Sequence, residues 1–346
     1  MSVYRALALQ TPCYAINGLS QEQAPARIRQ AIARIGDEIA AAKRFIGGDL
    51  RLVVLPEYAL TGFPMGEECE EWLELAALDP EGEEIASISE CARKTGVYLC
   101  LNAYERDHAF PGFYFQCCRV FSDEGKTVLL YRRLISLYAP TPFDLLSRFL
   151  AHYGESALFP VAETPLGRLG CIASEEILYP EIARALALRG AEILLHPTSE
   201  AGSPSLTPKE IARRARAIEN MAYLISANTA GVHGTALPAA SADGMSKILD
   251  YEGRVLAEAG FGPSMVAHAA IDLAALRRAR QRPGMANLLA RQRLALFRTS
   301  YQLEIEAPDG FLAGEALIPP TRAALRARHE QAIARLRALG IASEPP

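Results

Sequence analysis

Residues 50–64 have the sequence LRLVVLPEYALTGFP. Its first seven residues form a nearly unbroken apolar run, which is typical of a strand buried on both faces. The run ends directly in the carboxylate of Glu57. In open α/β architecture ligands bind at the ends of strands, where a carboxylate can take up and release protons. Glu57 is therefore a candidate acid–base residue, or alternatively a cap on the next backbone amides. Tyr58 and Phe63, in the turn that follows, are candidate pocket walls or core residues.

On both sides of this strand the apolar pattern alternates between helix spacing and strand spacing. We expect helices at 23–45, 82–95, 180–189 and 208–221. We expect strands at 3–9, 50–56, 97–105, 113–122, 127–133, 168–173, 191–197, 223–231, 245–250, 254–259 and 265–273. Hairpins beside crossover units predict an α/β body, residues 1–278, with two mixed sheets and helices packed outside them.

The remainder, residues 279–346, is predicted to be a C-terminal extension with one long helix at 320–339. Several arginines surround a leucine stripe on that helix. Such a helix packs on the body of its own chain or on a partner subunit.

Composition excludes several classes of protein. The chain has 346 residues and a net charge of −4, without the basic excess that nucleic-acid binding requires. No apolar run approaches the roughly 20 residues that span a membrane. Its seven cysteines contain no C-x-x-C pair and its six histidines are spread singly, so we expect no metal site. We expect a cytoplasmic protein without a cofactor.

Arg132 and Arg133 close the strand at 127–133. Because successive side chains of a strand point to opposite faces, at most one guanidinium points inward. The inward group can pair with a carboxylate or hold an oxyanion; edge-strand charges that discourage aggregation are the alternative.

Ser174 follows the strand at 168–173 and precedes the turn into the next helix. A small residue at such a turn can present a nucleophile, but a serine hydroxyl needs an adjacent base. No histidine is near it in sequence, so a turn or cap residue is the plainer interpretation.

Together these segments resemble the nitrilase, or carbon–nitrogen hydrolase, superfamily over roughly residues 3–275. The resemblance rests on LPEYALTGFP (55–64), GKTVLLYRRL (125–134), GCIASEEILYPEIAR (170–184), GAEILLHPTS (190–199), RARAIENMAYLISANTAG (214–231) and SKILDYEGRVLAEAG (246–260). It implies an α-β-β-α sandwich that forms homodimers or larger homo-oligomers. It also implies metal-free cleavage of small amides, nitriles or carbamoyl groups.

The resemblance further implies a catalytic Glu, Lys and Cys. Glu57 falls on the first position, whereas Arg133 stands at the Lys position and Ser174 at the Cys position. Arginine keeps the positive charge that stabilises an oxyanion. Serine is a far weaker acid than cysteine, so we expect ordinary thiol-based hydrolysis to be absent or very slow. Cys171 lies on the strand at the opposite parity and is not expected to substitute.

Two hypotheses follow. In the leading one the protein is a pseudoenzyme that binds a small polar molecule, such as an amide, nitrile or carboxylate-like compound. In the other it is an active enzyme that uses Ser174, or non-covalent chemistry of Glu57 and Arg133, on a small C–N substrate. Turnover that depends on Glu57 would reject the first hypothesis.

Three further residues are candidates for the pocket. Glu175 adjoins Ser174 and would influence it electrostatically. His196 ends a strand and either reaches the pocket rim or bonds to backbone. Asn228 ends another strand and is expected to orient the turn near residue 174.

Overall fold

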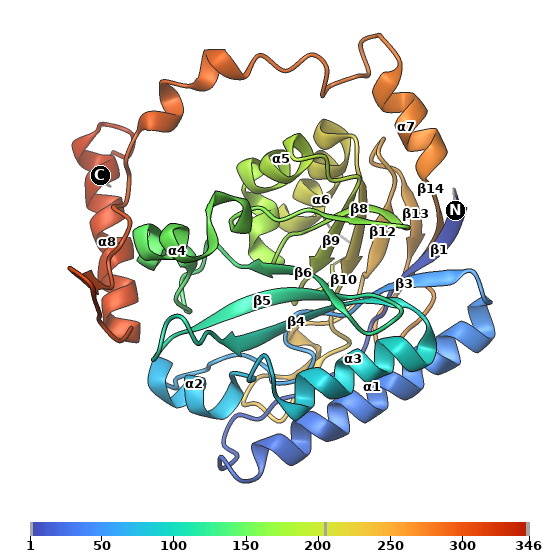
Figure 1. The fold of residues 1–346 in the computed structure, drawn as a ribbon, viewed down its shortest axis with the longest axis horizontal. Coiled ribbons are helices and arrows are strands. Elements are labelled where there is room, and N and C mark those ends of the chain that lie inside the picture. Colours follow the sequence, from blue (N-terminus) through green and yellow to red (C-terminus); the bar gives the residue numbers. More distant parts are fainter. Residues whose placement is uncertain (1–2, 204–205, 344–346) are drawn as a thin grey trace.

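Two six-stranded sheets packed face to face form the centre of the computed structural model, which describes residues 3–203 and 206–343 (Figure 1). The first sheet has the order β14 (His268–Asp272), β1 (Val3–Ala8), β3 (Leu50–Val54), β4 (Tyr98–Arg106), β5 (Tyr114–Phe121), β6 (Thr127–Arg132). The second has the order β13 (Val255–Glu258), β12 (Lys247–Leu249), β10 (Tyr223–Ala227), β9 (Ile193–Pro197), β8 (Gly167–Cys171), β7 (Ala162–Thr164).

Both sheets are mixed. In each, three central strands are parallel, β1–β3–β4 in one and β8–β9–β10 in the other. Antiparallel strands extend each sheet on both sides. This is the mixed topology that the hairpins and crossover units predict.

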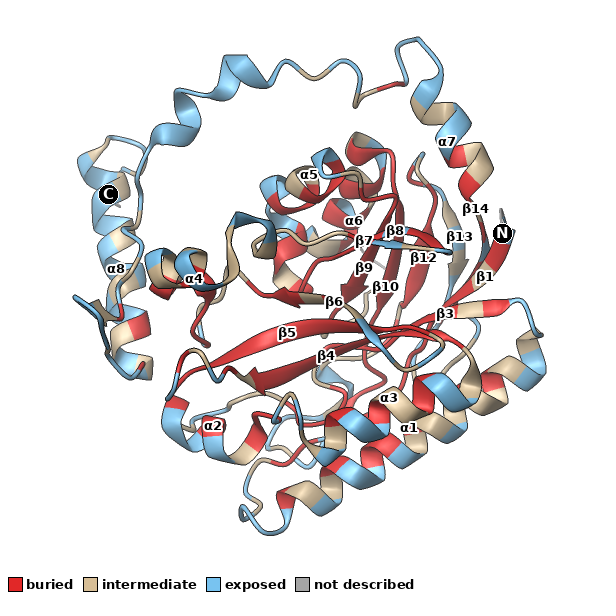
Figure 2. Ribbon diagram, in the orientation of Figure 1, coloured by how far each residue is buried: buried red, intermediate tan, exposed pale blue. Residues whose placement is uncertain are grey.

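Helices cover the outer face of each sheet and complete four layers. The first sheet is covered by α1 (Ala24–Ile46) and α3 (Glu83–Thr95), the second by α5 (Pro180–Leu188) and α6 (Pro208–Asn220) (Figure 1). Figure 2 shows the central strands buried and the outer faces of these helices exposed. The predicted α-β-β-α sandwich is therefore confirmed.

Strand alternation decides which apolar residues fill which layer. In β3, Leu52 and Val54 pack between the sheets, whereas Val53 packs under the helices. The adjacent Cys117 and Cys118 divide in the same way, one toward the helices and one between the sheets. Burial on both faces is what the nearly unbroken apolar run of residues 50–56 predicts.

Several elements differ from the sequence-based expectations. The strand predicted at 223–231 ends at Ala227, because the Asn228 amide leaves the ladder and donates to Ser246 Oγ at 2.9 Å. Three helices were not predicted: α2 (Cys69–Ala76), α4 (Leu146–Tyr153) and α7 (Leu273–Gln281). The first two are only eight residues long, too short for a clear periodic signal. Two small pairs, β2 (Cys13–Tyr14) with β11 (Val232–His233) and β15 (Leu312–Ala313) with β16 (Ala316–Leu317), were also not predicted.

The C-terminal extension runs from α7 along an exposed arc to α8 (Arg322–Ala338) (Figures 1 and 2). On α8, Leu325 is buried with the core of the first sheet, and Arg328 Nε lies 3.4 Å from Asp144 Oδ1. Both contacts are made with the body of the same chain. Across the part of the chain described, every helix is too short or too polar to span a bilayer.

Candidate active site

Glu57, Arg133 and Ser174 line one cavity of about 320 Å³. They come from the ends of β3, β6 and β8, strands that belong to both sheets. Tyr58, Phe63 and Glu175 also line it. The remaining lining residues are Pro64, Tyr104, Gln116, Ser136, Tyr138, Ala139, Ser199, Glu200, Lys209, Val232, Leu237, Pro238, Ala239, Ser241 and Ala242.

Glu57 is held by the backbone and by a buried amide. Its N–H donates to the carbonyl of Thr198 at 3.3 Å, which ties the end of β3 to the end of β9. Its Oε1 accepts from Gln116 Nε2 at 2.7 Å. The next residue, Tyr58, has a φ of +61°, a left-handed conformation that costs a non-glycine residue about 1–2 kcal/mol. Local strain of this kind is concentrated at functional sites.

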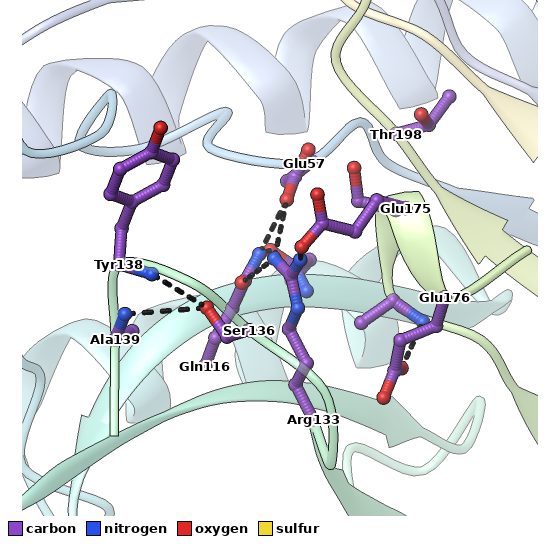
Figure 3. Close-up of polar contacts among 12 residues, drawn as sticks. Glu57, Gln116, Arg133, Ser136, Tyr138, Ala139, Glu175, Glu176 and Thr198 are labelled. Atoms are coloured by element: carbon purple, nitrogen blue, oxygen red, sulfur yellow. Dashed lines mark hydrogen bonds and ion pairs between the residues drawn. The ribbon is translucent and has the colours of Figure 1, made fainter. Parts of the chain in front are cut away.

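The two arginines after β6 point in opposite directions, as strand alternation requires. Arg132 pairs with Asp107 at 2.8 Å on the outer side of the sheet. Arg133 points into the cavity, where Figure 3 shows it reaching toward Glu57 and Glu175. It donates to Gln116 Oε1 at 2.6 Å, lies 3.5 Å from Glu57 Oε1, and forms an ion pair with Glu175.

These contacts determine the charge state of Arg133. Burial acts to lower the pKa of its guanidinium, but the facing Tyr58, Glu175 and Glu57 outweigh burial and raise it. The group is therefore a permanent cation. Its Nε also donates to the carbonyl of Ile135 at 2.7 Å. Four contacts thus engage a side chain that has five N–H groups.

Ser174 begins a short 3₁₀ helix, η3 (Ser174–Leu178), directly after β8 and a two-residue link. Its φ is +48°, a second left-handed non-glycine conformation in the cavity wall. Glu176 fixes the link to β6: its carboxylate accepts from Ala173 N at 3.0 Å and from Tyr131 Oη at 2.7 Å. Figure 3 shows Glu176 turned away from Glu57 and Glu175. Glu176 thus holds the turn, while Glu175 lines the cavity.

His196 is fully buried at the end of β9 and is not among the cavity-lining residues. Its Nε2 lies 2.8 Å from the carbonyl oxygen of Ser174, so Nε2 carries the hydrogen, because a carbonyl only accepts. Its Nδ1 lies 2.8 Å from Ser226 Oγ. Burial, aided by Arg213, holds the pKa of His196 well below its ordinary value. His196 is therefore bonded to the backbone and does not reach the pocket rim, which is one of the two alternatives that the sequence left open.

Asn228 is also absent from the cavity wall, contrary to its place among the expected pocket residues. Its Oδ1 accepts from Glu200 N at 3.0 Å and its Nδ2 donates to the Glu200 carbonyl at 2.9 Å. It therefore positions Glu200, a lining residue, rather than the turn at residue 174.

Sequence reasoning missed Lys209, which contacts the candidate nucleophile directly. From the first turn of α6, its Nζ donates to Ser174 Oγ and to Thr198 Oγ1, both at 3.2 Å. Burial lowers the pKa of the Lys209 ammonium. One signal was available: a cation in the first helical turn lies against the helix dipole, an unfavourable placement.

Gln116 was missed as well. It lies within strand β5 and joins three polar residues. Its Oε1 accepts from the guanidinium of Arg133, and its Nε2 donates to Glu57 and Asn102. The signal is an amide in a strand that is apolar apart from Arg119, because a buried polar group requires partners.

Cys171 packs between the sheets, fully buried beside Cys100 and Cys118. Burial, followed by contact with these thiols, raises its pKa well above the ordinary value. It does not line the cavity, as its strand parity predicts.

A larger cavity, about 460 Å³, lies on the outer side of β4, β5 and β6. Its charged walls are paired: Arg119 lies 2.5 Å from Glu105, and Arg132 pairs with Asp107. Ion pairs of this kind stabilise a wall and leave little for a ligand. Within residues 3–203 and 206–343, no group of His, Cys, Asp and Glu side chains is arranged to hold a metal ion.

Comparison with known proteins agrees with this architecture. The carbon-nitrogen hydrolase family model matches residues 10–281. A deaminated glutathione amidase of Rattus norvegicus is 28% identical over 208 residues, which are 58% of this chain and 62% of the relative. The chain thus spans less than two thirds of that relative. An omega-amidase of Danio rerio is 26% identical over 247 residues, 71% of this chain and 85% of the relative.

Solved structures share the fold. A carbon-nitrogen hydrolase from Helicobacter pylori G27 superposes with a TM-score of 0.66 at 23% identity, covering 87% of this chain and 99% of that one. An amidase mutant from Nesterenkonia sp. AN1, in complex with acrylamide, gives 0.61 at 21% identity, with 87% and 98% covered. With the family model matching most of its length, this chain belongs to the carbon-nitrogen hydrolase family.

Proposed function

We propose that this protein hydrolyses the C–N bond of a small amide, with Ser174 as the nucleophile. The observation that carries the proposal is the placement of Ser174 at a left-handed turn in the wall of the cavity that also holds Glu57 and Arg133. A turn held in this conformation by buried partners on both sides presents its side chain to the cavity in one orientation. A merely structural turn has no need of such strain.

The charges of the cavity favour an uncharged substrate. Three carboxylates, those of Glu57, Glu175 and Glu200, face the guanidinium of Arg133 and the amino group of Lys209. Because Arg213 pairs with Glu200 and Arg133 with Glu175, these charges nearly cancel, and an uncharged amide group finds both donors and acceptors. The volume of about 320 Å³ lies at the small end of ligand pockets.

Arg133 is suited to stabilise the oxyanion of a tetrahedral intermediate. Its charge is permanent, and one N–H remains beyond its four contacts. A cation aimed at the position where negative charge develops is usually the largest single contribution to such a reaction.

Ammonia release from acetamide, propionamide and acrylamide tests the proposal. The wild type should release ammonia, Ser174→Ala should not, and Ser87→Ala, which alters an exposed serine of α3 away from the cavity, should retain turnover. Intact-mass analysis during turnover should show an acyl group that maps to residue 174.

The pseudoenzyme hypothesis gives the opposite result. Saturable binding of these amides without ammonia release, unchanged by Ser174→Ala, would establish ligand binding and overturn the proposed hydrolysis.

A further inference from the structure

We infer that Lys209 is the general base of this site and forms a catalytic pair with Ser174. The inference rests on the proposed function, because it supplies the base that a serine nucleophile requires. Lys209 stands at none of the three positions, Glu, Lys and Cys, at which the resemblance places Glu57, Arg133 and Ser174.

Geometry places Lys209 in contact with the hydroxyl. Lys209 Nζ lies 3.2 Å from Ser174 Oγ, at the long end of hydrogen-bond reach, where catalytic contacts of ligand-free enzymes are often found. The two residues are 35 positions apart. Arg216 of α6 donates to the carbonyls of Ile177 and Leu178, at 3.0 and 3.2 Å, and so binds α6 to the turn that carries Ser174.

A third group orients the lysine. Thr198 Oγ1, fully buried at the end of β9, accepts from Lys209 Nζ at 3.2 Å. A neutral amine that donates one hydrogen to Thr198 keeps its lone pair for the serine proton. Activated nucleophiles share this arrangement, in which the nucleophile contacts a base and a third group orients the base.

The other titratable groups nearby are otherwise engaged. Both ring nitrogens of His196 have partners, Ser226 Oγ and the Ser174 carbonyl. Glu57 Oε1 faces Gln116 and Arg133. Of these groups, Lys209 is the one whose side-chain nitrogen lies within hydrogen-bond distance of Ser174 Oγ.

The surroundings of Lys209 balance its two protonation states. Burial and the positive N-terminal end of α6 disfavour the ammonium, so a neutral amine is accessible below the ordinary pKa of lysine. Carboxylates nearby stabilise the ammonium once it has formed. The charged and titratable groups that face it are Glu57, Arg133, Glu175, His196, Glu200 and Arg213.

Acylation and deacylation of Ser174 both pass a proton through Lys209. Neutral Lys209 takes the Ser174 hydroxyl proton while Oγ bonds to the amide carbon and the carbonyl electron pair moves to oxygen. When the C–N bond breaks, the ammonium of Lys209 protonates the departing amine and an acyl ester remains on Ser174. Water attacks that ester with its proton passing to Lys209, and collapse returns the proton to Ser174 and releases the acid.

The test uses the whole chain and methanesulfonyl fluoride, a small probe that sulfonylates an activated serine and releases fluoride. Intact mass and peptide mapping give the rate of modification at residue 174 between pH 6 and 11. Lys209→Met removes the amine, Lys209→Arg keeps a cation that cannot act as a base, and Lys126→Met alters an exposed lysine as the matched control. Thermal unfolding of each variant verifies that it folds.

The wild-type rate should rise with pH through a midpoint below the ordinary lysine value of about 10.4. Both Lys209 variants should react about 100-fold more slowly and lose that midpoint, while Lys126→Met should match the wild type. If Lys209→Arg is sulfonylated at a rate near that of the wild type, Lys209 is not the general base, while Ser174 remains the nucleophile. Absence of both sulfonylation at residue 174 and ammonia release by the wild type overturns the proposed function, and the pair with it.

Discussion

The imidazole of His196 donates to the carbonyl oxygen of Ser174 across 2.8 Å, so histidine and serine meet through the backbone and not through the hydroxyl. This contact holds the left-handed turn from the second sheet, while Glu176 holds it from the side of β6. His196 is therefore a positioning residue, and its role differs in a measurable way from that of a base.

Replacing His196 by Ala should lower kcat/KM for amide hydrolysis by about tenfold, because the turn loses one of its two buried supports and the nucleophile is less well placed. The midpoint of the pH profile should not move, since His196 does not take the proton. Rates measured from pH 6 to 11 on the same amide check both statements. Loss of the pH-dependent limb would make His196 a base and contradict this role.

Glu176→Gln should destabilise the protein by about 2–4 kcal/mol in urea unfolding. Both carboxylate oxygens accept hydrogen bonds, two from the Leu134 and Ile135 amides and two from Tyr131 and Ala173. An amide NH₂ in place of either oxygen would face at least one backbone N–H, and that donor would lose its acceptor.

The matched control is Glu175→Gln, which alters a half-exposed neighbour that lies on the cavity side. Its unfolding midpoint should change much less than that of Glu176→Gln. Equal destabilisation by the two variants would contradict the assignment of separate roles.

Glu57 and Arg133 should be energetically coupled. Removing one partner of a buried pair leaves an uncompensated charge, so Arg133→Met should cost about 3–5 kcal/mol of stability. In the double variant with Glu57→Gln the costs should fall short of the sum by at least 1 kcal/mol. A double-mutant cycle by chemical denaturation measures this, and additive costs would show that Gln116 alone satisfies Glu57.

Lys209→Met should raise the stability of the protein at neutral pH by about 1 kcal/mol, at the expense of activity. The folded-state pKa of Lys209 is lowered, so between that pKa and the ordinary value the unfolded chain binds more protons than the folded one. Wild-type stability contributed by this group therefore rises with pH across that window. The advantage of the variant should shrink toward pH 10, as thermal unfolding at several pH values will show; a variant less stable at every pH would contradict the burial cost.

Thiol reagents should not inhibit this protein. All seven cysteines are buried, and burial raises the pKa of the Cys91 and Cys69 thiols to about 11 and of Cys13 to about 12. The native protein should resist iodoacetamide at pH 8 for hours, whereas the urea-unfolded chain should take up seven labels by mass. Inactivation that parallels alkylation of Cys171 would show that this thiol reaches the substrate.

Much of the cavity wall could be predicted from short-range sequence patterns. Glu57 directly follows the apolar run that contains β3, Arg133 follows from alternation along β6, and Ser174 occupies the turn after β8. Each of these three predictions depends on neighbours within about ten residues along the chain. In an α/β fold the ends of the strands gather at one edge, which brings such residues together. His196 and Asn228 lie behind the cavity wall and bond to Ser226 and to the carbonyls of Ser174 and Gly244, and the local pattern does not give such contacts between distant segments.

The sequence by itself determined the four layers, the strand ends that meet, and the presence of a hydroxyl group at residue 174. These depend on short-range periodicity and residue chemistry. Only the tertiary structure decided that Lys209 touches Ser174 and Thr198, since that contact joins a helix, a turn and a strand through the packing of α6 on the second sheet. Whether a group can accept the serine proton depends on its distance from Ser174 Oγ, and the spacing of residues along the chain does not give that distance.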